Sequence, residues 1–462
     1  MYLPATCQAN NCRNSWWRGR DSDPPLPKLP SLDACISMTY LVETRNMKIL
    51  TGGDLIDGSG RDPITNATVV IDDEGRIVQV GKLSGIPPGA EVIDVSGRTI
   101  MPGLIDCHVH FFVDLKPLHD LAATPMSLRM FEAAANAKST LDSGVTSVRD
   151  ACGTPRGFKT ALERGLIPGP RMKISITPVS QTGGHGDMLM PSGIYHPLLP
   201  SGLPGKDPAE WPNGVADGVD EVRKSVRAIL KAGADVIKLM ASGGVLSPGT
   251  EPTSTQFTRE EIAAIVQEAK AQGKATMAHA QSAEGIRNAV ESGVGSIEHG
   301  IFVDEVTMAE MKRRGTFLVP TLQAIRAAIR RGESSPGSVL PESMRKARAT
   351  AQVQVENIRQ AVRFGVPVAM GTDAGVGEHG RNAEELGLLV EAGMSPMQAI
   401  VAATRTAAEC ARFTDAGTLE PGKRADLLVV DGNPLNDLRV MEDKSKLLMI
   451  MQGGRAHKNA IQ

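Results

Sequence analysis

Two patterns of hydrophobic and polar positions follow one another along the chain. Towards both ends, short apolar runs are separated by turns rich in glycine and aspartate, a pattern typical of a small β-sheet. The runs cover residues 47–50, 67–71, 76–80, 425–431 and 447–451. Neither end has enough strands to form a sandwich alone. We therefore expect residues 47–100 and 413–458 to pair into one composite β-sandwich domain.

Between these ends, apolar strands alternate with helical stretches. Helix starts are marked by a capping box at Thr258 and Glu261 and by the pair Ser395-Pro396, and glycines end several helices. The expected strands are residues 99–105, 146–149, 172–176, 235–240, 275–278, 296–298, 316–319 and 367–371. Eight such repeats predict an α/β fold, a (β/α)8 TIM barrel over residues 101–412. A doubly wound sheet is the alternative, but no GxGxxG turn follows an early strand.

Composition narrows the class of protein. The 462 residues carry a formal net charge of -2 and are 41% hydrophobic, so a nucleic-acid partner and a membrane span are not expected. Six cysteines without CxxC spacing fit a reduced, cytoplasmic compartment. Residues 1–46 hold Trp16, Trp17 and a proline run. We interpret them as a disordered tail or an over-called start, with a docking arm as the alternative.

Polar side chains stand at the carboxyl ends of five predicted strands. They are His108, His110, Lys238, His279, His299 and Asp373. Taken singly, each has an ordinary explanation as a structural histidine or a turn aspartate. Strand ends of a (β/α)8 barrel converge on one face, however, and the two histidines of an HxH share one side of a strand. The combination therefore predicts a metal site.

Lys238 lies in an apolar strand, VIKLM, with no adjacent acid. An unpaired ammonium buried beside metal ions would be very costly. Carboxylation of the amine by CO2 would convert it into an anionic ligand able to bridge two ions. A Schiff-base lysine is the alternative, although it would not need the surrounding histidines.

The segments PGLIDCHVH, IKLMASGGV, MAHA, SIEHG and MGTDAG resemble the amidohydrolase superfamily, and the resemblance covers residues 47–455. It is greatest to the Xaa-Pro dipeptidase (prolidase)-like and imidazolonepropionase-like branch, with ochratoxin-, molinate- and phenylurea-hydrolysing enzymes as relatives. The resemblance implies two divalent ions, zinc before cobalt or manganese. His108, His110 and Asp373 would bind one ion, His279 and His299 the other, and carboxylated Lys238 would bridge them.

The resemblance also implies hydrolysis of an amide-type C–N bond by a metal-bridging hydroxide, with Asp373 moving the proton. His185, in GGHG, is a candidate oxyanion donor or substrate contact, and His379 a weaker substrate contact. Arg149, by default, is expected at the surface. The expected substrate is a small molecule, an N-acyl amino acid or dipeptide, and the expected assembly is a homo-oligomer. Alternatives are a carbamate, thiocarbamate, phenylurea or ochratoxin-type amide hydrolase, a mononuclear deaminase and a non-catalytic relative.

Overall fold

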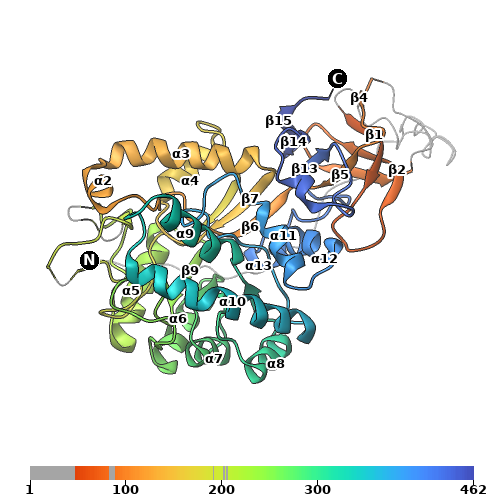
Figure 1. Cartoon of the computed structure of the whole chain (residues 1–462). Coiled ribbons are helices and arrows are strands. Elements are labelled where there is room, and N and C mark those ends of the chain that lie inside the picture. Colours follow the sequence, from red (N-terminus) through yellow and green to blue (C-terminus); the bar gives the residue numbers. More distant parts are fainter. Residues whose placement is uncertain (1–46, 83–88, 191, 201–202, 204–205, 462) are drawn as a thin grey trace, which may run out of the picture. The chain divides into compact units, whose positions relative to one another are not determined.

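The computed structural model of the protein describes residues 47–82, 89–190, 192–200, 203 and 206–461 (Figure 1). The interpretation of residues 1–46 as a tail or an over-called start lies outside these residues and stays a prediction. Within the described ranges, no helix is both long enough and apolar enough to pass through a bilayer.

Both ends of the described chain contribute to one mixed sheet with the strand order β15-β14-β13-β5-β1-β2-β3, in which β4 also pairs with β1. Its strands are β1 (Lys48–Leu55), β2 (Ile64–Ile71), β3 (Ile77–Gly81), β4 (Glu91–Asp94), β5 (Thr99–Pro102), β13 (Leu427–Val430), β14 (Leu447–Gln452) and β15 (Arg455–Asn459). The two ends join where β5 pairs antiparallel with β13. Strands β4 (EVID) and β15 (RAHKN) were missed by the sequence analysis because they lack an apolar run.

The middle of the chain forms two parallel sheets, with the orders β6-β7-β8 and β12-β11-β10-β9. The strands are β6 (Leu104–Val109), β7 (Val145–Asp150), β8 (Arg171–Ile174), β9 (Val236–Met240), β10 (Ala275–Ala280), β11 (Ser296–His299) and β12 (Phe317–Val319). An isolated parallel bridge joins Val179, after β8, to Leu239 in β9. The segment 367–371 lies between the sheets, because Leu318 donates to the carbonyl of Pro367 and Cys107 to that of Met370, both at 2.9 Å.

Two predicted strands need correction. The run 99–105 is not one strand but two, since it breaks at Gly103 and changes sheets. A Cβ on Gly103 would lie 2.2 Å from the Thr146 hydroxyl oxygen, and the Gly103 amide donates to Asp426 instead of continuing either ladder. The run 367–371 forms only a bridge at Val368 rather than a strand. The apolar pattern marked burial correctly in both places but carried no information on hydrogen-bond partners.

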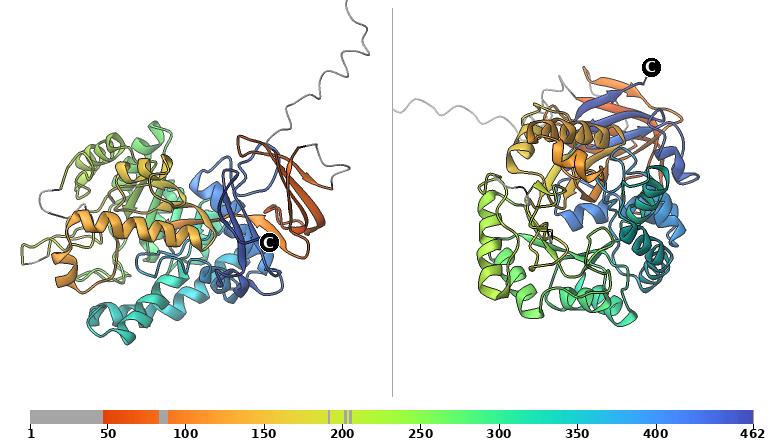
Figure 2. Two further views of the ribbon diagram at one scale, coloured as in Figure 1. Left: turned by 90° about the horizontal axis from the view of Figure 1, so that it is seen from above. Right: turned by 60° about the vertical axis from the view of Figure 1, so that its left-hand side comes forward.

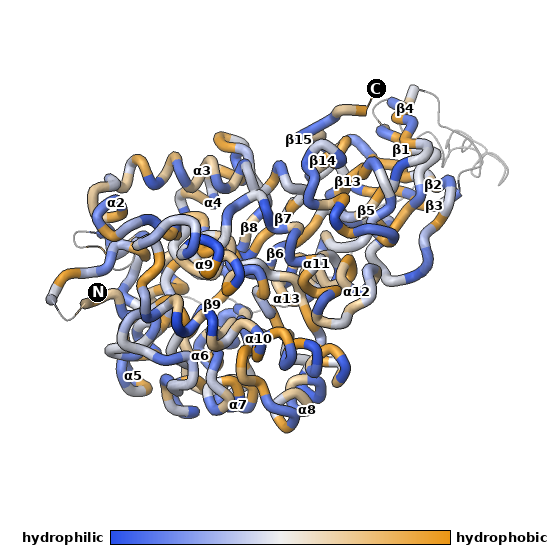
Figure 3. The backbone as a smooth tube through the Cα atoms, viewed as in Figure 1, coloured by the Kyte–Doolittle hydropathy of each residue, from blue (hydrophilic) through white to orange (hydrophobic). Residues whose placement is uncertain are grey.

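Helices connect and cover the parallel strands, and the right-hand view of Figure 2 shows them lying around the strands. They are α2 (Leu118–Ala123), α3 (Met126–Asp142), α4 (Arg156–Glu163), α5 (Gly218–Ala232), α6 (Arg259–Ala271), α7 (Ala283–Glu291), α8 (Glu305–Arg314), α9 (Leu322–Ser334), α10 (Pro341–Phe364), α11 (Glu384–Glu391), α12 (Pro396–Ala402) and α13 (Arg405–Ala411). Hydrophobic and hydrophilic segments alternate along α3 in Figure 3, as expected for a helix with one face on the core.

The predicted helix starts are confirmed. Thr258 and Glu261 form a reciprocal capping box at the start of α6, and Ser395 with Gln398 forms another at the start of α12. The helix expected after Pro396 is interrupted, because α12 ends at Ala402 and α13 starts only at Arg405. These caps fix where each helix begins relative to the strand before it.

Candidate active site

The HxH pair stands at the end of β6, and a buried carboxylate holds its backbone in place. Asp106 accepts from the His108 amide at 3.0 Å and from the Thr372 amide at 3.1 Å, while its second oxygen accepts from the Thr372 hydroxyl at 2.6 Å. Burial raises the pKa of Asp106 to about 6 against these stabilising bonds. Asp106 thus ties the strand carrying the histidines to the turn carrying Asp373.

Asp373 faces both histidines of the pair. Its Oδ1 lies 3.1 Å from Nε2 of His110 and 3.6 Å from Nε2 of His108. These three side chains are buried, and their ligating atoms lie within 4.8 Å of one another, close enough to share one ion. Asp373 adopts the left-handed backbone conformation with φ of 58°, and His299 does so with φ of 69°. Such strain in non-glycine residues is typical of functional sites.

The remaining predicted ligands lie beside this group. The ring centroid of His299 is 5.1 Å from that of His108 and 4.7 Å from that of His279. Lys238, 2% exposed, is on β9, where it pairs in register with Met277 of β10. His279 is two positions further along β10, so both side chains point to the same face of the sheet. The six predicted residues therefore lie near one another, and among the described histidine, cysteine and acidic residues the group His108, His110 and Asp373 meets the close distance above.

Each of the four imidazoles has one ring nitrogen held by the protein. Nδ1 of His110 faces the Cys152 carbonyl at 3.2 Å, and Nδ1 of His299 faces the Thr321 hydroxyl at 2.7 Å. For His279 the bonded atom is Nε2, 3.0 Å from the Gly243 carbonyl. Nδ1 of His108 faces Glu298 at 2.7 Å. A carbonyl or carboxylate on one nitrogen fixes the tautomer and directs the other nitrogen to a metal, whereas the Thr321 hydroxyl can donate or accept and only orients the His299 ring.

The charges of these groups also suit a cation. Burial lowers the pKa of His108, His279 and His299, that of His299 to about 4, so their rings are neutral at pH 7. Burial alone would raise the pKa of Asp373, but the neighbouring His108, His110 and His299 together outweigh it and the pKa is lowered. Burial would lower the pKa of His110, but Cys152 and Asp373 outweigh it and the pKa is raised, so this ring would give up a proton on binding an ion. Imidazoles and an ionised carboxylate are donors that Zn, Co or Mn accepts, so the residues present fit such an ion.

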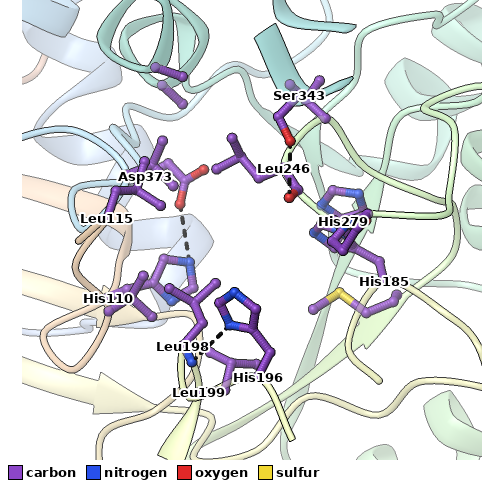
Figure 4. Close-up of a pocket in the computed structure, with 18 of the residues that line it drawn as sticks. His110, Leu115, His185, His196, Leu198, Leu199, Leu246, His279, Ser343 and Asp373 are labelled. Carbon is purple, nitrogen blue, oxygen red and sulfur yellow. Dashed lines mark hydrogen bonds and ion pairs between the residues drawn. The ribbon is translucent and has the colours of Figure 1, made fainter. Parts of the chain in front are cut away.

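A cavity of about 460 Å³ opens above these residues (Figure 4). Its walls are largely apolar and include Leu115, Met188, Leu198, Val245, Leu246 and Ile325. Figure 4 shows two pairs of polar residues on opposite sides of the cavity. His110 lies next to Asp373 on one side, and His185 lies next to His279 on the other. The volume is that of an ordinary small-molecule site.

His185 lies in the cavity wall, as predicted for a substrate contact. Its ring stacks on that of His279 with centroids 4.0 Å apart, and its Nδ1 is 2.8 Å from the Ser247 hydroxyl. Burial lowers its pKa to about 3, so the ring is neutral. His196, for which no role was predicted, also lines the cavity, and its Nδ1 accepts from the Leu198 amide. No motif around His196 marked it in the sequence.

The structure corrects two expectations. His379 does not line the cavity: its Nε2 lies 3.2 Å from the His110 carbonyl, its Nδ1 3.1 Å from the Thr140 hydroxyl, and its ring stacks on Phe111. It supports the strand end of His110, and the described cavity lining gives no support to the predicted substrate contact. Arg149, expected at the surface, is only 2% exposed.

Arg149 belongs to a buried charge network that the sequence analysis missed. Its guanidinium donates to both oxygens of Glu298, at 3.0 and 3.2 Å, and to the Ser296 hydroxyl at 3.1 Å. Ser296 in turn donates to Glu298 at 2.6 Å. The bonds from Arg149 and Ser296 therefore fix the orientation in which the Glu298 carboxylate contacts His108. The only signal in the sequence was an acid directly before His299, in SIEHG.

Parallel strands carrying histidines at or just after their ends, with an aspartate on a neighbouring turn and an apolar cavity above, define a metal-binding α/β enzyme. A model of the amidohydrolase family matches residues 99–456. The chain belongs to the amidohydrolase family and is a hydrolase acting on carbon–nitrogen bonds. The predicted resemblance is confirmed, and the TIM-barrel type of fold seen in this family agrees with the parallel sheets.

Relatives of known structure extend this comparison. Ochratoxinase of Aspergillus niger is 36% identical over 426 residues, which are 89% of this chain and 86% of the relative. A prolidase complexed with N-methylphosphonate-L-proline is 36% identical with a TM-score of 0.82, covering 89% of this chain and all of the other. A Xaa-Pro dipeptidase with methionine bound in its active site is 32% identical with a TM-score of 0.80, at the same coverage.

Proposed function

We propose that the protein hydrolyses an amide-type C–N bond in a small molecule, an N-acyl amino acid or dipeptide with a bulky apolar group. Two divalent ions, zinc before cobalt or manganese, would serve the reaction. His108, His110 and Asp373 would hold one ion, His279 and His299 the other, and carboxylated Lys238 both. The convergence of free imidazole nitrogens with Asp373 on the floor of one cavity carries the proposal.

When bound, two such ions lower the pKa of a water molecule and polarise the scissile carbonyl. The side chains of the protein supply the remaining steps. Asp373, ionised and partly screened from water, accepts the proton of the attacking water and returns it to the leaving nitrogen. Amines leave poorly unless they are protonated, so this transfer favours an amide substrate.

His185 is the proposed donor to the substrate or to the developing oxyanion. The Ser247 hydroxyl lies at its Nδ1. If Ser247 donates to Nδ1, the ring proton lies on Nε2, the nitrogen not engaged by Ser247. The lowered pKa of His185 keeps this ring a neutral donor at pH 7.

Lys238 is the proposed site of carboxylation. Burial lowers the pKa of its amine, which favours the neutral form. The neutral nitrogen attacks CO2, forms an N–C bond and releases one proton, which leaves an anionic carbamate. This change places an anion beside the ions where an unmodified lysine would offer an amine or a costly buried cation, and so explains Lys238 at this position.

The apolar walls of the cavity support the substrate class. Side chains such as Leu115, Leu198 and Ile325 provide no groups for a highly polar substrate. An ochratoxin-type amide is the second candidate, because the chain is 36% identical to an ochratoxinase. Carbamate, thiocarbamate and phenylurea substrates remain alternatives within the same chemistry.

We also propose that the two parallel sheets belong to one closed (β/α)8 barrel over residues 101–412. The bridge between Val179 and Leu239 and the hydrogen bonds of the segment 367–371 support closure. Residues 47–100 and 413–458 would form the separate composite β domain, which the pairing of β5 with β13 supports. We still predict that the protein forms a homo-oligomer and lies in the cytoplasm.

Matched amide, ester and phosphotriester substrates with the same apolar group test the function on zinc-loaded protein. We expect the amide to rank first relative to its uncatalysed rate. A lactone or phosphotriester ranking first would contradict the assignment. Elemental analysis should find two ions per chain after reconstitution with metal and bicarbonate. One ion would favour a mononuclear deaminase, and no binding would favour a non-catalytic relative.

A further inference from the structure

The loop that follows β9 forms one wall of the cavity and contacts two of its histidines. Residues 245–249 line the cavity. The Gly243 carbonyl lies 3.0 Å from Nε2 of His279, and the Ser247 hydroxyl lies 2.8 Å from Nδ1 of His185. The loop, residues 243–250, therefore determines where both rings stand.

A lysine on α10 binds the backbone of this loop. Lys346 is 1% exposed, and its Nζ donates to the carbonyls of Gly244 at 3.2 Å, Ser247 at 2.7 Å and Thr250 at 2.8 Å. An ammonium has three N–H donors, and all three are used on one short loop. Glu342, one helical turn earlier, lies 3.3 Å from the same nitrogen and balances its charge.

A second contact from α10 and a close approach to His185 complete the arrangement. Ser343 donates to the Leu246 carbonyl at 3.3 Å, as Figure 4 shows on the side of the cavity opposite His110. A Cβ added to Gly244 would lie 2.2 Å from Cε1 of His185, so the loop backbone packs directly against that ring. Any outward movement of the loop would release the ring and the Ser247 bond together.

We propose that Lys346 is a positioning residue for substrate binding. Its amino group donates hydrogen bonds to three carbonyls of loop 243–250. These bonds hold Gly244 and Ser247 against His185 and keep the apolar wall of the cavity in place. A buried lysine without these acceptors would be strongly unfavourable, so the lysine and the loop order one another. The kinetic part of this inference rests on the proposed function, whereas the ordering of the loop does not.

Two variants of Lys346 test the proposal. Lys346→Ala removes the amino group and leaves space, and Lys346→Met removes it and fills the space. In both we expect faster hydrogen–deuterium exchange of loop 243–250, with exchange of β9 and β10 unchanged. With an apolar N-acyl amino acid, KM should rise about tenfold or more, because the apolar wall is lost equally in ground and transition states, and kcat should fall by a smaller factor because His185 is no longer held in place. The ion content should stay that of the wild type.

Chemical rescue separates positioning from a general loss of structure. Ammonium chloride should restore loop protection and lower KM in Lys346→Ala, where the three carbonyls face a vacated space. It should not do so in Lys346→Met or when sodium chloride is used at equal ionic strength. Lys312→Met, at an exposed lysine of α8, serves as the control and should resemble the wild type.

Wild-type exchange of the loop in both Lys346 variants would overturn the proposal. So would parallel losses of ion content, thermal stability and kcat, since these would show a merely structural lysine. If the wild type cleaved no C–N substrate, the proposed function would fail, yet the exchange and rescue results would still decide the role of Lys346.

Discussion

Glu298 points one carboxylate oxygen at Nδ1 of His108, at 2.7 Å, and both side chains are almost fully buried. The other three imidazoles of the described site have a carbonyl or hydroxyl partner on the corresponding nitrogen, which is Nδ1 in His110 and His299 and Nε2 in His279. His110 meets an acid, Asp373, only through its other ring nitrogen. Of the four rings, His108 alone therefore has a carboxylate on the nitrogen that faces away from the ligand group. A carboxylate partner raises the basicity of the opposite nitrogen and so strengthens its bond to a metal.

Glu298→Gln should weaken binding of the ion held by His108, His110 and Asp373. We expect a loss of about 10- to 100-fold in affinity, the usual size for such outer partners. Metal titration of the chelator-stripped protein measures it. Glu385→Gln is a matched control, because Glu385 is equally buried but bonds only the amides of Leu322 and Gln323. Equal metal affinity in Glu298→Gln and wild type would contradict the prediction.

Lys238→Ala should lose one of the two ions and most of the activity, because the bridging carbamate can no longer form. Elemental analysis and turnover measure the two losses separately. Added short-chain carboxylic acids should restore part of each by occupying the vacated position. A Lys238→Ala protein with two ions and normal turnover would show that carboxylation is not involved.

The stability of the metal-free protein should depend on pH through Glu385. Burial raises its pKa from 4.5 to about 8. Between these values the folded chain keeps a proton that the unfolded chain has released, so the free energy of unfolding falls as pH rises, by up to about 1.4 kcal/mol per pH unit. Urea unfolding of wild type and Glu385→Gln over this range measures the difference in slope. Parallel curves would exclude a titrating Glu385.

Leu115→Ala should make the enzyme less selective for bulky acyl groups. Leu115 is 9% exposed and lines the cavity near Asp373 (Figure 4). Removal of its side chain should cost about 1–3 kcal/mol of binding to a long apolar acyl group and much less for an acetyl group. The ratio of kcat/KM for the two substrates gives the result. An unchanged ratio would place the acyl group elsewhere.

Removal of residues 1–46 should leave turnover and ion content unchanged. All six proposed ligands, His185 and Lys346 belong to the described part of the chain beyond this segment. Turnover per ion-loaded chain, compared before and after truncation, measures the effect. An inactive or unfolded truncated chain would show that the segment is part of the enzyme.

The strand ends and their histidines could be predicted because they depend on local rules. Side chains alternate along a strand, so His108 and His110 had to share a face, and parallel strands bring distant ends such as His279 and His299 together. The expected helix starts at Thr258 and Ser395 follow from equally local chemistry.

The supporting contacts could not be predicted in this way. Arg149 and Glu298 are separated by 149 positions, and Lys346 meets carbonyls about a hundred positions earlier. Neither set of contacts produces a periodic pattern in the sequence. A single charged residue that is buried cannot be told from one at the surface by the sequence alone. His379 was predicted as a weak substrate contact because it follows the segment 367–371, but position after such a segment does not tell which way the side chain points, and the described cavity lining does not include it. The break at Gly103 depended on its contact with Thr146.

The pairing of β5 with β13 has a consequence for synthesis. Residues 427–459 follow the entire parallel-strand region in the chain, so β5 (Thr99–Pro102), fully buried in the complete fold, keeps an unpaired edge until they emerge from the ribosome. Unpaired strand edges recruit other chains. Messages truncated before codon 427 should therefore yield aggregating products rather than weakly active enzymes, even though every proposed ligand has already been translated.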